Sequence, residues 1–74
     1  MKSQKPPRSL REARSKANLT QDRLAKKLGL TRVAVSHWEV GRAVPNGSSR
    51  LLLALTLDCA PSTVNSWFPE RVAA

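Results

Sequence analysis

Residues 19–45 read LTQDRLAKKLGLTRVAVSHWEVGRAVP, and this segment predicts two short helices joined by a tight turn. The first helix is expected over about residues 20–28, because three apolar side chains share one helical face: Leu24, Ala25 and Leu28. Gly29 follows, and glycine adopts a left-handed conformation at a helix end without steric strain. The second helix is expected over about residues 31–40 and can be capped by Thr31.

The second helix is predicted to have one buried face and one exposed face. The buried face comprises Ala34, Val35 and Trp38, and the exposed face comprises Arg32, Val33, Ser36 and His37. A guanidinium group can bond guanine, hydroxyl and imidazole groups can donate or accept, and an apolar group can pack on a thymine methyl. The exposed face is therefore suited to base edges. Val33 has a second interpretation, in which it is half-buried at the edge of a wide core face.

The charge of this 74-residue chain is strongly positive and unevenly placed. Lys and Arg number 13 against 5 Asp and Glu, a net charge of +8, and residues 1–50 contain 12 of the basic side chains. Double-stranded DNA is the natural partner of such a surface, because neutralised phosphates release counterions and supply affinity. The alternative is that the basic face is merely solvated.

Several other functions lack the residues they need. Cys59 has no second cysteine to pair with, and one His with one Cys makes no metal site, so neither a metal nor a cofactor is expected. The apolar run 51–57 is too short to cross a membrane, and the N-terminus lacks a signal-peptide core. An enzyme is not expected, because His37 has no evident orienting carboxylate or nucleophile.

The helix-turn-helix segment resembles the Cro/CI-type regulators, a lambda-repressor-like family that includes the small lambdoid phage repressors. The residues that carry the resemblance are Thr20, Gln21, Leu24, Ala25, Gly29, the polar-rich stretch from Thr31 to Ser36, Trp38, Glu39, Gly41 and Pro45. The resemblance implies an all-α, five-helix DNA-binding domain in a cytoplasmic protein of bacterial or phage origin.

The same resemblance implies roles for residues outside the base-reading face. Contacts to the DNA backbone are expected from Gln21, Thr31, Arg42 and Asn46, and Gln21 would also brace the second helix. Gln21 could instead simply face solvent, and the loop around Arg42 could be an inert connector. Glu39 is expected to form a structural ion pair with Arg14, and losing one partner of a partly buried pair costs on the order of 3–5 kcal/mol.

The remaining chain divides into an arm, a domain and a tail. Residues 1–8 are expected to be a flexible basic arm that either reaches along DNA or only solubilises, residues 9–69 the domain, and residues 70–74 a C-terminal tail. Ser9 and Glu12 are expected to form a capping box for another helix, which begins next to Ser9. The helix that includes residues 51–57 is apolar almost all round, which predicts central burial.

The predicted function is that of a sequence-specific DNA-binding regulator, a Cro-like repressor that occupies a palindromic operator as a homodimer. Trp67 and Phe68 either close the core or bury against a second subunit, and the second alternative assigns them to the dimer interface. The alternative function is an antitoxin or adaptor that uses the surface around Trp67 and Phe68 to bind another protein.

Overall fold

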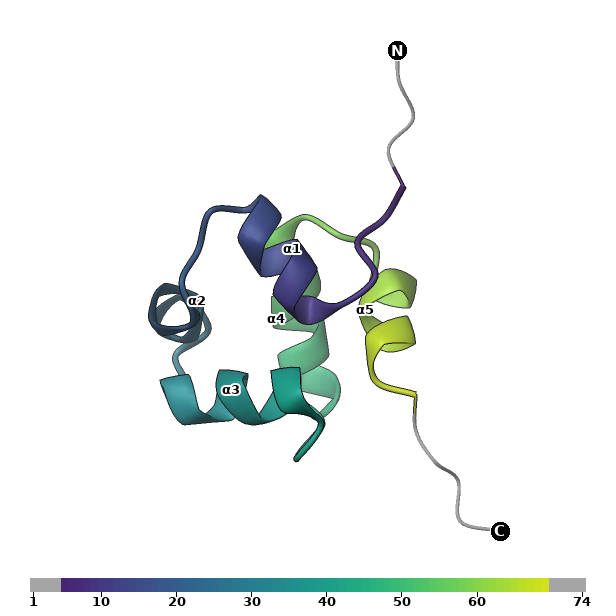
Figure 1. The fold of residues 1–74 in the computed structure, drawn as a ribbon. Helices are drawn as coiled ribbons and strands as arrows, with labels where there is room; N and C mark the ends of the chain where they lie inside the picture. The colour runs from purple at the N-terminus through teal and green to yellow at the C-terminus, as the bar shows by residue number, and fades with distance from the viewer. Residues whose placement is uncertain (1–4, 70–74) are drawn as a thin grey trace, which may run out of the picture.

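The computed structural model describes residues 5–69 and contains five α-helices over that range (Figure 1). They are α1 (Leu10–Lys16), α2 (Gln21–Leu28), α3 (Arg32–Val40), α4 (Gly47–Leu57) and α5 (Pro61–Trp67). The expected all-α, five-helix fold is confirmed. The expectations for residues 1–4 of the arm and for the tail, residues 70–74, lie outside the described residues.

Side-chain caps determine where the first four helices begin. Each capping oxygen accepts a hydrogen bond from the backbone N–H three residues further on, and the four caps are Ser9, Thr20, Thr31 and Asn46. Each cap thereby satisfies a donor that the helix itself leaves unpaired. The capping box at α1 differs from the expected one in a single hydrogen bond. The Glu12 carboxylate accepts from the backbone N–H of Arg8 instead of that of Ser9.

Left-handed residues end the two helices of the central segment. Gly29 follows α2 with φ of 73°, and Gly41 follows α3 with φ of 81°. Residues with a Cβ rarely adopt this conformation, so glycine at these two positions lets the chain turn sharply after each helix. The predicted turn between α2 and α3 is therefore present.

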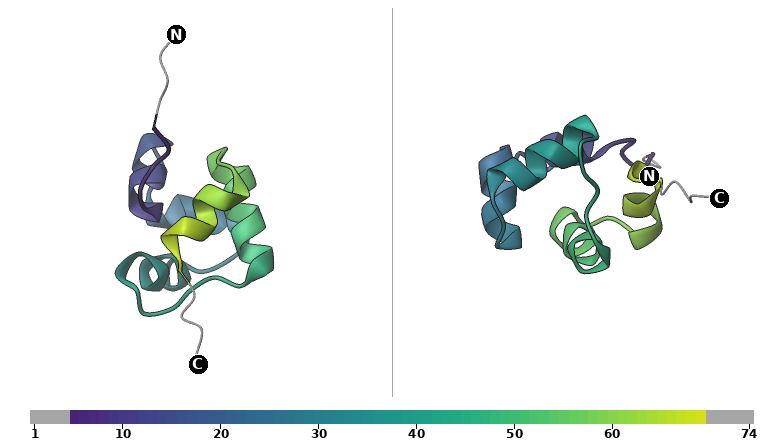
Figure 2. Two further views of the ribbon diagram at one scale, coloured as in Figure 1. Left: turned by 90° about the vertical axis from the view of Figure 1, so that its right-hand side faces the viewer. Right: turned by 90° about the horizontal axis from the view of Figure 1, so that it is seen from below.

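The five helices surround one small core. Packing joins α2 to α3, α4 to α5, α2 to α4 and α1 to α3. In Figure 1, α3 lies across the lower end of the molecule and α4 runs upward behind it; the two views of Figure 2 show α4 at one side, with the other helices on its inner side. This arrangement leaves one long face of α3 and one long face of α4 without a neighbouring helix.

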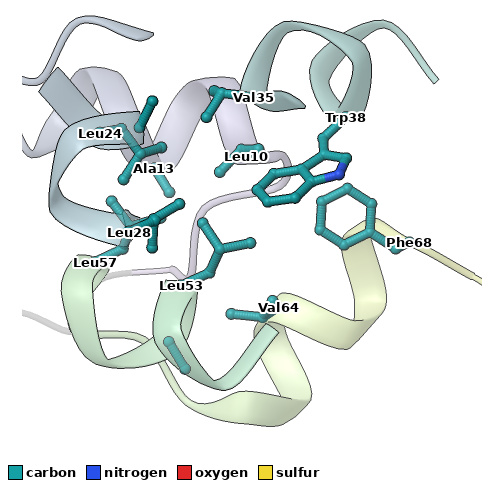
Figure 3. Close-up of a cluster of buried hydrophobic side chains, with 12 residues drawn as sticks. Leu10, Ala13, Leu24, Leu28, Val35, Trp38, Leu53, Leu57, Val64 and Phe68 are labelled. Carbon is teal, nitrogen blue, oxygen red and sulfur yellow. The ribbon is translucent and has the colours of Figure 1, made fainter. Parts of the chain in front are cut away.

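The core is formed by apolar side chains from all five helices and from the residue after α5 (Figure 3). Its members are Leu10, Ala13, Leu24, Ala25, Leu28, Val35, Trp38, Leu53, Ala54, Leu57, Val64 and Phe68. Val35 and Trp38 come from the face of α3 that was expected to be buried, while Ala34 is partly buried beside them. Burial of this face fixes how α3 sits on the domain.

The expected central burial of α4 is wrong. Leu53, Ala54 and Leu57 are buried, but Leu51 is 57% exposed, Leu52 41% and Leu55 79%. The physical reason is position: α4 lies at the side of the molecule, so only the face toward α2 and α5 has partners. Apolar composition all round a helix therefore does not guarantee burial all round.

The two aromatic residues at the end of α5 close the core. Phe68 is 5% exposed, and the half-buried Trp67 packs edge-to-face on it. The indole Nε1–H of Trp67 donates to the carbonyl of Pro7 at 2.9 Å, which attaches the described part of the N-terminal arm to α5. The assignment of Phe68 to a dimer interface is thus corrected, because its own chain already covers it.

We predict that Leu53→Ala lowers the free energy of unfolding by about 3 kcal/mol, since a fully buried leucine leaves a cavity when it is truncated. Leu55→Ala is the matched control on the same helix, and we expect a change within about 0.5 kcal/mol. Urea denaturation of the wild-type chain and both variants measures the difference. Equal losses in the two variants would contradict the arrangement of α4.

Candidate nucleic-acid interface

The outer face of α3 brings the four predicted base-reading residues together. Arg32 and Val33 are exposed, Val33 to 59%, whereas Ser36 and His37 are partly buried. The four side chains line one shallow hollow of about 240 Å³. The interpretation of Val33 as a half-buried residue at the core edge is wrong. The hollow therefore presents a guanidinium, an apolar group, a hydroxyl and an imidazole on one surface.

The start of α2 lies next to the start of α3. A second open hollow is lined by Arg14, Thr20, Gln21, Asp22 and Arg32. Backbone N–H groups at a helix N-terminus favour an anion, and Arg32 adds a positive charge to the same hollow. This neighbouring surface is thus suited to a phosphate beside the base-reading face.

The expected ion pair between Arg14 and Glu39 is present in the structure. Nε of Arg14 lies 2.6 Å from Oε2 of Glu39, and its Nη2 donates to Oε1 at 3.2 Å. The side chains are only 16% and 4% exposed, respectively. Nη1 of Arg14 also donates to the carbonyl of Leu19 at 2.9 Å. A two-bond guanidinium–carboxylate pair of this kind has a defined geometry, so it fixes α1 against the end of α3.

Gln21 joins the same network. Its Nε2 donates to Oε1 of Glu39 at 2.9 Å, so the bracing of α3 implied by the family resemblance has a specific partner. The amide oxygen and the second N–H are not needed for this bond. The second N–H can donate to a DNA phosphate, with the side chain held in place by Glu39. Sequence reasoning paired Glu39 with Arg14 alone and missed this third member.

The network lowers the pKa of Glu39. Burial is the largest single influence and raises this pKa, but hydrogen bonds from Arg14 and Gln21, together with the positive charges of Arg14 and Arg11, outweigh it. The pKa of Glu39 consequently lies below its ordinary value of 4.5. The charged carboxylate is the form that the fold stabilises.

The other residues expected at the DNA backbone are exposed. The oxygens of Thr31 and Asn46 cap α3 and α4, which leaves the hydroxyl proton of Thr31 and the amide N–H groups of Asn46 as donors. The Arg42 side chain is exposed, and its backbone N–H donates to the carbonyl of His37 at 2.9 Å. The loop is thereby held to the end of α3, while the expected phosphate contacts stay predictions.

Arg50 supports this loop and was missed in the sequence. Its Nε donates to the carbonyl of Pro45 at 2.9 Å, its Nη1 to Oδ1 of Asn65 at 3.1 Å, and its guanidinium lies 5.6 Å from the centre of the Phe68 ring. The end of the α3–α4 loop is thus connected to α5. The available signal was that Arg50 is the one charged residue in the apolar sequence of α4.

Nothing in the described part of the chain indicates a metal site or a membrane span. No group of three His, Cys, Asp or Glu side chains within residues 5–69 is placed to hold a metal ion. Over the same residues, no helix combines the length and apolar character that a bilayer crossing requires.

Comparison with known proteins matches residues 10–64 to a helix-turn-helix family model. Repressor protein C2 of Salmonella phage P22 is 38% identical over 52 residues, which are 70% of this chain and 24% of that protein. The HTH-type transcriptional regulator DicA of Escherichia coli (strain K12) is 36% identical over 55 residues, 74% of this chain and 41% of that protein. The chain therefore spans less than half the length of these two relatives.

A solved structure resembles the fold over almost its whole length. It is the solution structure of the DNA-binding domain of the P22 C2 repressor, with a TM-score of 0.74 and 30% sequence identity. The match covers 99% of this chain and 96% of that one. The likeness thus extends beyond α2 and α3 to all five helices.

We predict that the stability of the fold depends on the charge of Glu39. Because its pKa is lower in the folded state, the stabilisation is present above about pH 4.5 and is lost as the pH falls through the folded-state pKa. Denaturation of wild-type and Glu39→Gln chains from about pH 7 to about pH 3 measures the effect. Their difference in unfolding free energy should shrink toward low pH, and parallel curves would contradict it.

Proposed function

The chain belongs to the helix-turn-helix family, and on this premise we propose that it is a sequence-specific double-stranded DNA-binding repressor. One observation carries the proposal: Arg32, Val33, Ser36 and His37 line a single hollow on the outer face of α3, at the end of a strongly basic domain. The similarity to a phage repressor supports repression by occupancy of an operator.

In this proposal α3 enters the major groove with its outer face toward the bases. Arg32 bonds guanine, Ser36 and His37 donate to or accept from base edges, and Val33 packs on a thymine methyl. The exposed side chain of Val33 thereby gains an apolar contact, which water does not provide. Val35 and Trp38 on the opposite face keep the helix on the core and set its orientation in the groove.

The DNA backbone is held on both sides of α3. Gln21, fixed by Glu39, contacts a phosphate near the start of α2, and Thr31 does so at the start of α3. Arg42 and Asn46 contact phosphates from the loop that follows α3. Contacts of this type fix the register of a protein on the duplex without reading the sequence.

The operator is proposed to be palindromic and occupied by two copies. One recognition helix reaches only a few base pairs, and two helices in successive major grooves read a longer site. The fold supports this arrangement with a short, accessible α3 on one side of a small domain. Control would then depend on protein concentration and on the association of two copies.

Selection of binding sites from random duplex DNA tests the proposal. The best site is then titrated at several salt concentrations, with the mass of the complex measured. We expect a palindromic site, a steep salt dependence and two protein copies on each duplex. If no sequence is enriched and all duplexes bind weakly, the basic surface binds DNA only by its charge and the proposal fails.

We predict that Arg32→Ala weakens binding to the selected site about 10- to 100-fold and binding to random DNA much less, because a base contact is lost together with one positive charge. Arg42→Ala should weaken both about equally and reduce the salt slope by about one, because a phosphate contact is lost. Lys16→Ala removes the same charge beside Cys59, near the other end of α4, and serves as the control. Gel-shift titrations on both DNAs measure the changes. An equal loss on both DNAs for Arg32→Ala would refute its role as a base reader.

A further inference from the structure

The described part of the N-terminal arm lies against α5, away from the proposed base-reading face. Residues 5–7 line one hollow together with residues 58–60 and Thr63, which belong to the start of α5 and the loop before it. In Figure 1 the arm leaves α1, passes beside α5 and then runs away from α3. The indole N–H of Trp67 holds the carbonyl of Pro7 there. Residues 5–7 are therefore placed to act on DNA binding through the domain rather than by direct contact.

A continuous set of contacts connects Trp67 with Arg50. The rings of Trp67 and Phe68 meet edge-to-face, with 6.3 Å between their centres. The guanidinium of Arg50 lies 5.6 Å from the centre of the Phe68 ring, and its Nη1 donates to Oδ1 of Asn65 at 3.1 Å. Aromatic pairs and cation–π contacts have preferred geometries. The position of Trp67 consequently constrains Phe68 and, through it, Arg50.

Arg50 also holds the loop between α3 and α4. Its Nε donates to the carbonyl of the buried Pro45 at 2.9 Å, and its backbone N–H donates to the carbonyl of Asn46 at 2.9 Å. The Asn46 side chain in turn caps α4 by accepting from the N–H of Ser49 at 2.8 Å. A guanidinium has several donors in a rigid plane, so Arg50 bonds this loop and α5 at the same time. The location of Asn46 thus depends on Arg50.

We propose that Trp67 and Arg50 are positioning residues for the contacts that the α3–α4 loop makes with DNA. Docking of Pro7 on Trp67 fixes the end of α5, and Arg50 transmits this position to the loop that contains Arg42 and Asn46. A loop that is already ordered loses less conformational entropy when it binds phosphates, which strengthens binding. The arm thereby strengthens DNA binding without contacting the DNA. This inference rests on the proposed function.

Two substitutions that keep the net charge test the proposal. Arg50→Lys replaces the planar guanidinium by one ammonium group, which cannot reproduce its geometry at Pro45 and α5. Trp67→Phe removes the N–H that Pro7 accepts and keeps an aromatic ring. We expect each variant to bind the selected site and random DNA about 3- to 10-fold more weakly than the wild type. Titrations at several salt concentrations should also give smaller salt slopes, because phosphate contacts are lost. Wild-type affinity in both variants would refute the proposal.

A double-mutant cycle tests whether Arg50 acts through Arg42. In a chain that already has Arg42→Ala, one phosphate contact of the loop is absent, so Arg50→Lys should weaken binding less than it does alone. Gel-shift titrations of the two single variants and the double variant measure this difference. Fully additive effects would overturn the proposed route from Arg50 to the loop.

Leu57→Ala is the control that separates positioning from a general loss of stability. Leu57 is buried at the other end of α4 and lies away from Phe68 in Figure 3. Its truncation leaves a cavity and lowers the stability of the fold, yet the folded variant should bind DNA with wild-type affinity. Binding is measured at a temperature at which circular dichroism shows every variant to be folded. An equal loss of affinity in Leu57→Ala and Trp67→Phe would contradict a positioning role.

Amide hydrogen exchange tests the coupling without DNA. The backbone N–H groups of Arg42 and Arg50 form hydrogen bonds at the two ends of the loop. Both should exchange faster in Trp67→Phe than in the wild type, because the loop opens more often when α5 is less firmly held. The N–H of Leu24 in α2 is the internal control and should exchange at the wild-type rate. Equal exchange of the loop in the two chains would overturn the proposal.

The positioning role and the proposed function can fail separately. If Trp67→Phe accelerates exchange in the loop and weakens binding to all duplexes alike, but no DNA sequence is selected, the repressor function is refuted and the positioning role stands. If the chain selects a palindrome and Trp67→Phe changes neither exchange in the loop nor affinity, the positioning role is refuted and the function stands.

Discussion

The carboxylate of Glu39 holds together parts of the chain that are distant in sequence. Its two oxygens accept hydrogen bonds from Arg14 of α1 and Gln21 of α2, while Glu39 itself is near the end of α3. Burying an ion pair costs desolvation free energy, and good geometry with additional hydrogen bonds is what offsets this cost. The network also determines position, because it fixes the angle at which α3 and the side chain of Gln21 face a ligand.

The orientation of α3 depends on two opposite faces of the same short helix. Val35 and Trp38 are packed in the core, so rotation of α3 about its axis would expose them and bury Arg32. The core and the ion-pair network thus act together, one fixing rotation and the other fixing the helix end. Side chains on the exposed face can vary without loss of this packing, which allows one fold to present different base-reading groups.

The charged side chains are unevenly divided between two parts of this small domain. The helices α1 to α3 carry most of the charged side chains of the described residues, whereas α4 and α5 carry Arg50 alone. Arg50 connects the two parts, because it binds the carbonyl of Pro45 in the loop after α3 and the side chain of Asn65 in α5. Movement of α5 would consequently disturb the loop, so the apolar side of the domain is mechanically coupled to the proposed DNA-contacting side.

The sequence by itself determined the positions of the helices and the face of α3 that points outward. Caps and left-handed glycines act within a few residues, so local sequence was sufficient to place Ser9, Gly29 and Thr31. Only the tertiary structure decided that the leucines of α4 are exposed, that Phe68 is buried, and that Gln21 and Arg50 have distant partners. These outcomes depend on which element lies beside a side chain, and helical periodicity specifies a face without specifying what covers it.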